Sequence, residues 1–125
     1  MIFLSRRFQV KDRIDSREKG KRAERECAKV WSDFGFPSRR GQQYSGLGNA
    51  DIVGPEGWHV EVKHCETTRL PEWTAQAMRD AKKGEIPLVC HRKNRGDWWG
   101  AIRLDDFLSL SWKQMARSQG WVEPE

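Results

Sequence analysis

The chain has 125 residues, of which 33% are charged, and it carries a formal net charge of +5 with a pI near 9.4. This length suffices for one domain, and 7 tryptophans and 5 phenylalanines supply volume for a hydrophobic core. No apolar run is long enough to span a membrane, and Met1 to Leu4 is too short for the apolar region of a secretory signal. The cysteines lack a C-x-x-C spacing and fit reduced thiols, so we expect a soluble protein of the cytoplasm, or of the host cytoplasm if viral.

Basic residues are concentrated in the first part of the chain. Residues 1–50 hold 12 lysines and arginines against 6 acidic residues, whereas residues 51–125 hold 11 against 12. Such a concentration is typical of a surface that binds nucleic-acid phosphate. A basic face that is merely solvated gives the same count, so the charge supports nucleic-acid binding without establishing it.

The N-terminal segment is expected to lead into a long helix. Residues 1–14 show no firm periodicity and fit an arm, an edge strand or a disordered lead, and a single domain is expected over residues 15–125. The helix is predicted to begin at Asp15, with Glu18 three residues later as in a capping box, and to end at Gly35. Its apolar stripe has helical period and consists of Ala23, Cys27, Val30, Trp31 and Phe34.

Charged side chains flank this helix and the strand predicted after it. Glu24 lies beside the apolar stripe, so it can project toward a neighbouring sheet, and a surface ion pair is the alternative. Pro37–Gln43 is predicted to be the first strand, with Arg39 and Arg40 on opposite faces, so that one of them can face a nucleic acid. The small residues at positions 45–49 suit a close approach to phosphate, and a plain flexible connection explains them equally.

A hairpin with its loop at Gly54–Gly57 is predicted to carry the chemistry. Proline at the second position and glycine at the last suit a three-residue loop, in which a type I turn precedes a left-handed residue. This loop length places Asp51 directly opposite Glu61, with both carboxylates on one face of the sheet. Because strand side chains alternate, Lys63 shares that face while the neighbouring valines point into the core.

The paired carboxylates indicate a divalent cation. Two carboxylates at about 4 Å repel by about 4 kcal/mol at an effective dielectric near 20, so a compensating positive charge is needed. Mg²⁺ accepts a few carboxylate oxygens, waters and phosphate oxygens, and Lys63 could orient or help deprotonate an attacking water. A surface hairpin with charges on its solvated face is the alternative reading of the same spacing.

The rest of the chain is expected to complete a sheet and add helices. A second helix is predicted near Pro71 and is expected to end at Gly84, with Gln76 on one of its polar faces. Pro87–Arg92 and Trp98–Ile102 have the apolar character of two further strands.

Two short helices are predicted at the C-terminal end. The first covers Asp105–Leu108, and the second is capped at Ser111 and ends at Gly120. Three large side chains of this region are predicted to be packing residues, namely Trp112, Met115 and Trp121.

Two motifs resemble those of a known nuclease superfamily. Asn49-Ala50-Asp51 followed by Glu61-Val62-Lys63 resembles the bipartite motif of the PD-(D/E)XK nucleases. Upstream, Lys19–Glu26 with its Glu-Arg pair and Gly35–Arg40 resemble the opening of archaeal-type Holliday junction resolvases, and the likeness continues to Arg103. The chain departs from that family at Ala50, where proline is usual and makes no chemical contribution.

The resemblance implies a restriction-endonuclease-like α/β fold, with a mixed four- to five-stranded sheet flanked by helices. It implies that Asp51, Glu61 and the Val62 carbonyl hold Mg²⁺, for which Mn²⁺ can substitute. Glu24 would reach the metal directly or through water, and Lys63 would position the attacking water. The implied DNA-contacting residues are Arg25, Ser45 and Gln76, with Arg39 and Arg40 of the basic strand as further candidates.

The function that the resemblance implies is resolution of four-way DNA junctions. A homodimer would make paired symmetric nicks in a Mg²⁺-dependent reaction that leaves 5′-phosphate ends. A nuclease of the same superfamily acting on other branched, damaged or sequence-specific DNA is one alternative. A basic nucleic-acid-binding module whose carboxylates are structural is the other, and the intact Asp, Glu and Lys set argues against it.

Overall fold

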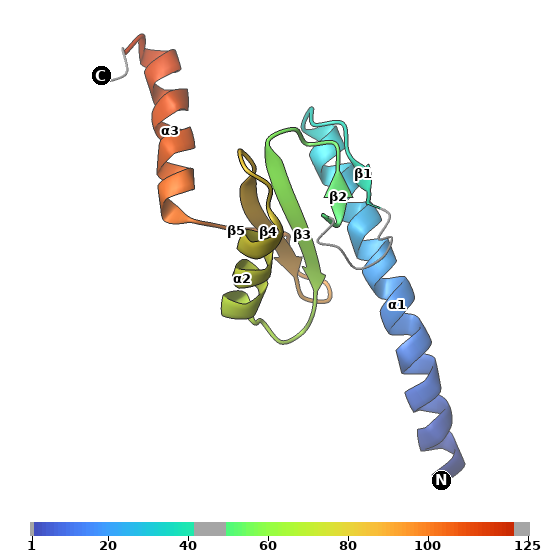
Figure 1. The fold of residues 1–125 in the computed structure, drawn as a ribbon. Helices are drawn as coiled ribbons and strands as arrows, with labels where there is room; N and C mark the ends of the chain where they lie inside the picture. The colour runs from blue at the N-terminus through green and yellow to red at the C-terminus, as the bar shows by residue number, and fades with distance from the viewer. Residues whose placement is uncertain (1, 42–49, 122–125) are drawn as a thin grey trace.

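The computed structural model of the chain describes residues 2–41 and 50–121, with side chains from residue 16 onward. The elements are, in chain order, α1 (Ile2–Asp33), β1 (Arg39–Arg40), β2 (Ile52–Val53), β3 (Trp58–His64), α2 (Leu70–Asp80), β4 (Ile86–Arg92), β5 (Trp99–Ile102) and α3 (Leu104–Gln119). The predicted order of a helix, three strands, a helix and two strands is confirmed, with one long helix at the C-terminal end (Figure 1).

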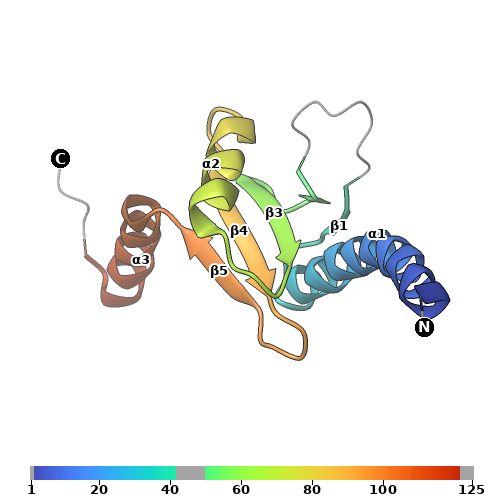
Figure 2. The same cartoon turned by 90° about the horizontal axis from the view of Figure 1, so that it is seen from below.

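The five strands form one mixed sheet in the order β1-β2-β3-β4-β5. β3 and β4 are parallel, and every other pair is antiparallel. A parallel pair needs a crossover connection, which α2 provides. α1 covers one face of the sheet and α2 covers the other (Figure 2). This is the α/β fold with a restriction-endonuclease-like arrangement that the sequence predicted.

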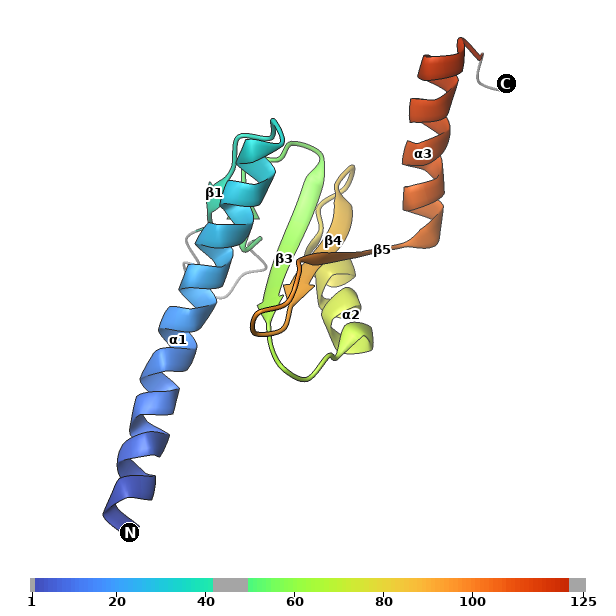
Figure 3. The ribbon, with the colours of Figure 1, turned by 180° about the vertical axis from the view of Figure 1, so that it is seen from behind.

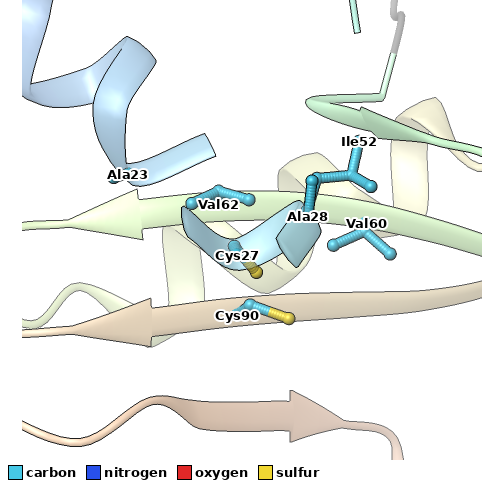
Figure 4. Close-up of a cluster of buried hydrophobic side chains, with 7 residues drawn as sticks. All are labelled: Ala23, Cys27, Ala28, Ile52, Val60, Val62 and Cys90. Atoms are coloured by element: carbon cyan, nitrogen blue, oxygen red, sulfur yellow. The ribbon is translucent and has the colours of Figure 1, made fainter. Parts of the chain in front are cut away.

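Each face of the sheet carries its own apolar cluster, because the buried strands present hydrophobic side chains on both sides. The apolar side chains of β2 and β3 that face α1 alternate along the chain with the acidic residues Asp51 and Glu61. The seven buried members of this cluster are Ala23, Cys27, Ala28, Ile52, Val60, Val62 and Cys90 (Figure 4). The α1 members are small, so the helix packs closely on the sheet. On the opposite face, Trp73 and Ala77 of α2 pack on Val89 of β4.

The first helix begins earlier than the sequence indicates. α1 starts at Ile2, so residues 2–14 extend the helix instead of forming an edge strand, and Asp15 lies within the helix rather than at its cap. No proline or glycine precedes Gly20, so nothing in this stretch stops the helix. The N-terminal part of α1 runs beyond the sheet (Figures 1 and 3). Whether residues 1–14 act as a separate arm stays a prediction.

The first strand is shorter than expected. β1 contains only Arg39 and Arg40, although the Gly41 N–H still donates to the Asp51 carbonyl at 2.8 Å. The Ser38 N–H donates to the Ser32 hydroxyl of α1 at 3.0 Å, so the chain before β1 is tied to the helix rather than to β2. Positions 42 and 43 of the predicted strand lie outside the described residues.

The prediction of two C-terminal helices is wrong, because α3 is one continuous helix. Gly120 ends it with a positive φ of 69°, as predicted. α3 projects away from the sheet, so its large side chains are not packing residues of the domain (Figures 1 and 3). Trp112, Met115 and Trp121 are 39%, 48% and 50% exposed, and the rings of Trp112 and Trp121 stack at 5.3 Å. Among the described helices, none combines the length and apolar character that crossing a membrane requires.

Candidate active site

The hairpin between β2 and β3 has the predicted register. Ile52 pairs with Val60, which puts Asp51 directly opposite Glu61. The Asp51 N–H donates to the Val60 carbonyl at 3.0 Å, so backbone pairing reaches the acidic residue itself. Gly57 has a φ of 85°, the left-handed conformation that a three-residue loop requires. The loop therefore fixes the relative position of the two carboxylates.

The carboxylates are buried rather than exposed on a solvated face. Asp51 is 5% exposed and Glu61 is 2% exposed. Glu61 lies between Val60 and Val62, which pack against α1, so it points to the opposite face, where α2 lies. This burial excludes the alternative of a surface hairpin whose charges are all solvated. Buried like charges need compensation, which marks the pair as a candidate functional site.

The electrostatics of Asp51 fit a cation site. The pKa of Asp51 is raised from 3.8 to about 7, first by burial and then by the negative charges of Glu61 and Glu24. The Val62 N–H donates to Asp51 Oδ2 at 2.8 Å and opposes the rise in pKa. The N–H and C=O of a strand residue point to the same side, so the Val62 carbonyl also faces Asp51. Asp51, Glu61 and this carbonyl thus offer oxygen ligands of the kind that Mg²⁺ or Mn²⁺ prefers.

Lys63 and Gln76 meet beside the carboxylates. Lys63 lies two residues after Glu61 on β3 and therefore on the same face, toward α2. Its Nζ donates to Gln76 Oε1 of α2 at 2.9 Å. The structure thus brings together two residues that sequence analysis selected separately, one on a strand and one on a helix.

His59 is a buried member of the same face that sequence analysis did not select. It is 2% exposed, and its Nε2 lies 2.7 Å from Glu61 Oε1. The hydrogen bond to Glu61 raises the pKa of His59, and burial opposes the rise. The signal was present in the sequence, since His59, Glu61 and Lys63 alternate along one strand. Asp80 was missed too, although it lies four residues after Gln76 and so on the same face of α2.

The other predicted site residues differ in their relation to this centre. Glu24 of α1 is near enough for its charge to raise the pKa of Asp51, but its Oε2 accepts a 2.6 Å hydrogen bond from Arg40 Nε. Arg40 therefore faces α1, and Arg39 points to the opposite face, which carries Asp51. Arg39 and Arg25 are both exposed. Ser45 lies outside the described residues.

An open pocket of about 860 Å³ adjoins the hairpin. Its lining includes Arg39, His59 and Lys82, so it joins basic side chains to the face of the sheet that carries the acidic residues. The lining also contains Glu56 and Glu85, and it does not include Asp51, Glu61 or Lys63.

The comparison with known protein families agrees with this geometry. The model of the family described as "Phage putative PDDEXK endonuclease" matches residues 15–122, which is well over half of the chain. No curated protein and no solved structure matches the chain. The match supports a nuclease of the PD-(D/E)XK type, a class that generally uses divalent metals, and it does not extend to the archaeal-type Holliday junction resolvases. The chain belongs to this family of phage PD-(D/E)XK endonucleases.

Proposed function

We propose that the chain is a Mg²⁺-dependent, structure-selective DNA endonuclease that resolves four-way junctions as a homodimer. The observation that carries the nuclease activity is the convergence of Asp51, Glu61 and Lys63 on one buried face, with Gln76 holding the lysine. The choice of a four-way junction rests on the resemblance of Lys19–Arg103 to junction resolvases and on the basic N-terminal part of the chain.

The roles of the catalytic residues follow from their contacts. Asp51, Glu61 and the Val62 carbonyl would hold Mg²⁺, with Glu24 assisting through water. The bound ion would lower the pKa of a water and neutralise charge on the scissile phosphate. Lys63 Nζ, oriented by Gln76 Oε1, would hold the attacking water against phosphorus. Attack of the water on phosphorus would break the bond to the 3′-oxygen, which leaves as the 3′-hydroxyl, so the products would carry 5′-phosphate and 3′-hydroxyl ends.

Binding of DNA would depend mainly on phosphate contacts. Arg39 is the better placed strand arginine, because Arg40 is held by Glu24 while Arg39 is exposed on the face of Asp51. Arg25 of α1 and Ser45, which precedes Asp51 in the chain, would add contacts. Such contacts carry no sequence information, so shape would determine the choice of substrate.

A homodimer is proposed because junction resolution needs two symmetric cuts and each chain holds one site. The projecting helix α3 has an exposed apolar surface, and we propose that a second copy of the chain covers this surface. Leu104, Phe107 and Leu108 are 67%, 52% and 53% exposed, although large apolar side chains grouped on one helix are normally covered. A two-fold pair of such helices would bury these side chains without any other molecule.

Other substrates fit the same active site. A PD-(D/E)XK nuclease for flaps, damaged DNA or a sequence-specific duplex site would need the same carboxylates and lysine. A non-catalytic nucleic-acid-binding module would not need two buried carboxylates beside a lysine that is hydrogen-bonded to Gln76. The experiment must therefore separate substrates as well as detect cleavage.

A labelled four-way junction and a linear duplex of the same sequences test the proposal. We expect tighter binding of the junction at matched salt in EDTA, and paired nicks near the crossover in Mg²⁺. The variant Arg39→Ala should weaken binding of both DNAs and reduce its dependence on salt. Equal affinity for the two DNAs, or cuts at one fixed sequence in the linear duplex, would reject junction resolution in favour of another nuclease substrate.

A further inference from the structure

Three side chains next to the proposed catalytic residues form a second group of potential metal ligands. His59 and Glu61 come from β3, and Asp80 is the last residue of α2. One ligand atom of each residue can be chosen so that all three atoms lie within 4.8 Å of one another. Asp51 is not a member of this group, so Glu61 is the residue that the group shares with the Asp51 pair.

The group is buried and acidic. The side chains of His59, Glu61 and Asp80 are 3%, 2% and 15% exposed. A protonated His59 compensates Glu61 through the 2.7 Å contact between Nε2 and Oε1. Asp80 accepts a 3.1 Å hydrogen bond through Oδ1 from Arg79, whose side chain is 70% exposed. One divalent ion among the three would balance both carboxylates where solvent screens little.

The spacing of the three atoms suits one ion. Ligands bound at about 2.1 Å lie about 3 Å apart at right angles and about 4.2 Å apart across the ion. His59 Nε2 and Glu61 Oε1 are 2.7 Å apart, which is close to the spacing of two ligands at right angles. The upper limit of 4.8 Å between any two of the three atoms exceeds the spacing across an ion by an amount that side-chain rotation can remove. An ion at this position would take the place of the proton on His59 Nε2, because a ligating imidazole must be neutral.

We propose that His59, Glu61 and Asp80 form a second divalent-metal site, which shares Glu61 with the site at Asp51. One imidazole and two carboxylates favour a transition ion such as Mn²⁺ over Mg²⁺, which prefers oxygen ligands alone. His59 is the member of the group that lines the 860 Å³ pocket beside the hairpin, so the site borders this pocket on its His59 side. This inference rests on the proposed nuclease site only for the shared carboxylate of Glu61.

Counting bound Mn²⁺ on the full chain without DNA tests the proposal. Calorimetry and electron paramagnetic resonance should find two ions per chain in the wild type and one in Asp80→Asn. His59→Gln should also bind one ion, because the amide can keep a hydrogen bond to Glu61 but is a poor metal ligand. Asp51→Asn should lose the other ion, and the double variant Asp51→Asn with Asp80→Asn should bind none.

Asp105→Asn is the matched control, since it removes an exposed carboxylate from α3 and should leave two ions bound. Each variant is checked for folding by its thermal transition in EDTA, and Mn²⁺ should raise that transition less in Asp80→Asn than in the wild type. A single ion in the wild type with unchanged affinity in Asp80→Asn would overturn the proposal.

The result is independent of the outcome for the proposed function. Loss of one ion in Asp80→Asn together with no cleavage of any DNA would support the second site and reject the nuclease. Metal-dependent cleavage by a chain that binds one Mn²⁺ regardless of Asp80 would do the reverse.

Discussion

At the scale of single residues, the raised pKa of Asp51 makes the stability of the metal-free protein depend on pH. Its pKa in the folded chain, about 7, lies above the ordinary 3.8 because of burial and of the charge on Glu61. A raised carboxyl pKa stabilises the fold fully below pH 3.8, and this stabilisation is lost as pH rises to about 7. The loss amounts to as much as about 4 kcal/mol at 1.36 kcal/mol per pKa unit.

Asp51→Asn therefore should be as stable as the wild type near pH 4 in EDTA and more stable near pH 8. The amide oxygen can still accept the hydrogen bond from the Val62 N–H, so the substitution removes the charge but not the contact. Chemical denaturation at the two pH values measures the difference. A variant less stable than the wild type at pH 8 would show that the Asp51 charge stabilises the fold instead of straining it.

Lys63→Ala should abolish DNA cleavage and leave Mn²⁺ binding within a few-fold of the wild type. The reason is that Lys63 contacts Gln76 and would act on water and phosphate, whereas the proposed metal ligands are other residues. Single-turnover cleavage and calorimetry measure the two effects separately. Lys113→Ala, at an exposed position of α3, should change neither. Near-normal cleavage by Lys63→Ala would mean that this lysine has no catalytic role.

At the scale of elements, the hairpin was predictable because its loop determines its register locally. The proline and glycines of residues 54–57 specify a loop length, and that length alone puts Asp51 opposite Glu61. The meeting of Lys63 with Gln76 needed a tertiary contact between β3 and α2, so sequence analysis could only name the two residues.

The ends of the helices were predicted less well, for physical reasons. α1 continues to Ile2 because no helix-breaking residue precedes Gly20, even though the apolar period there is weak. In α3, Ser111 has the identity of a helix cap, but no glycine or proline separates Leu104 from Gln119, so the helix continues through it. The amphipathic pattern of α3 predicts a helix, but nothing in this segment indicates that the helix projects away from the sheet.

Gly54→Ala should disrupt the hairpin more than Gly57→Ala. Both glycines have positive φ, 118° and 85°, but only at Gly54 would a Cβ meet backbone, 2.2 Å from the Pro37 carbonyl oxygen. We expect a loss of about 2–4 kcal/mol for Gly54→Ala, from strain and overlap together, and of about 1 kcal/mol for Gly57→Ala. Urea denaturation of the two variants measures the losses, and equal losses would contradict this account of the loop.

At the scale of the whole molecule, the proposed homodimer depends on α3. Phe107→Glu with Leu108→Glu should convert a dimer into a monomer, because both side chains are about half exposed in the single chain and would be buried against a second copy. Light scattering after gel filtration measures the mass. Lys113→Glu, on another face of α3, should leave the dimer intact. A wild-type chain that stays monomeric on junction DNA, or a double variant that stays dimeric, would assign α3 another role.

The family to which the chain belongs and the geometry at Asp51, Glu61 and Lys63 both indicate metal-dependent cleavage of DNA. The most direct measurement is the cleavage of three DNA substrates, namely supercoiled plasmid, linear duplex and a four-way junction. The wild type and Glu61→Gln are each assayed on them in Mg²⁺ and in EDTA. The glutamine keeps the size of the side chain and a hydrogen-bonding oxygen near His59. We predict cleavage by the wild type in Mg²⁺ and none in EDTA or by Glu61→Gln. No cleavage of any DNA by the wild type, or equal cleavage by Glu61→Gln, would contradict the assignment of this site.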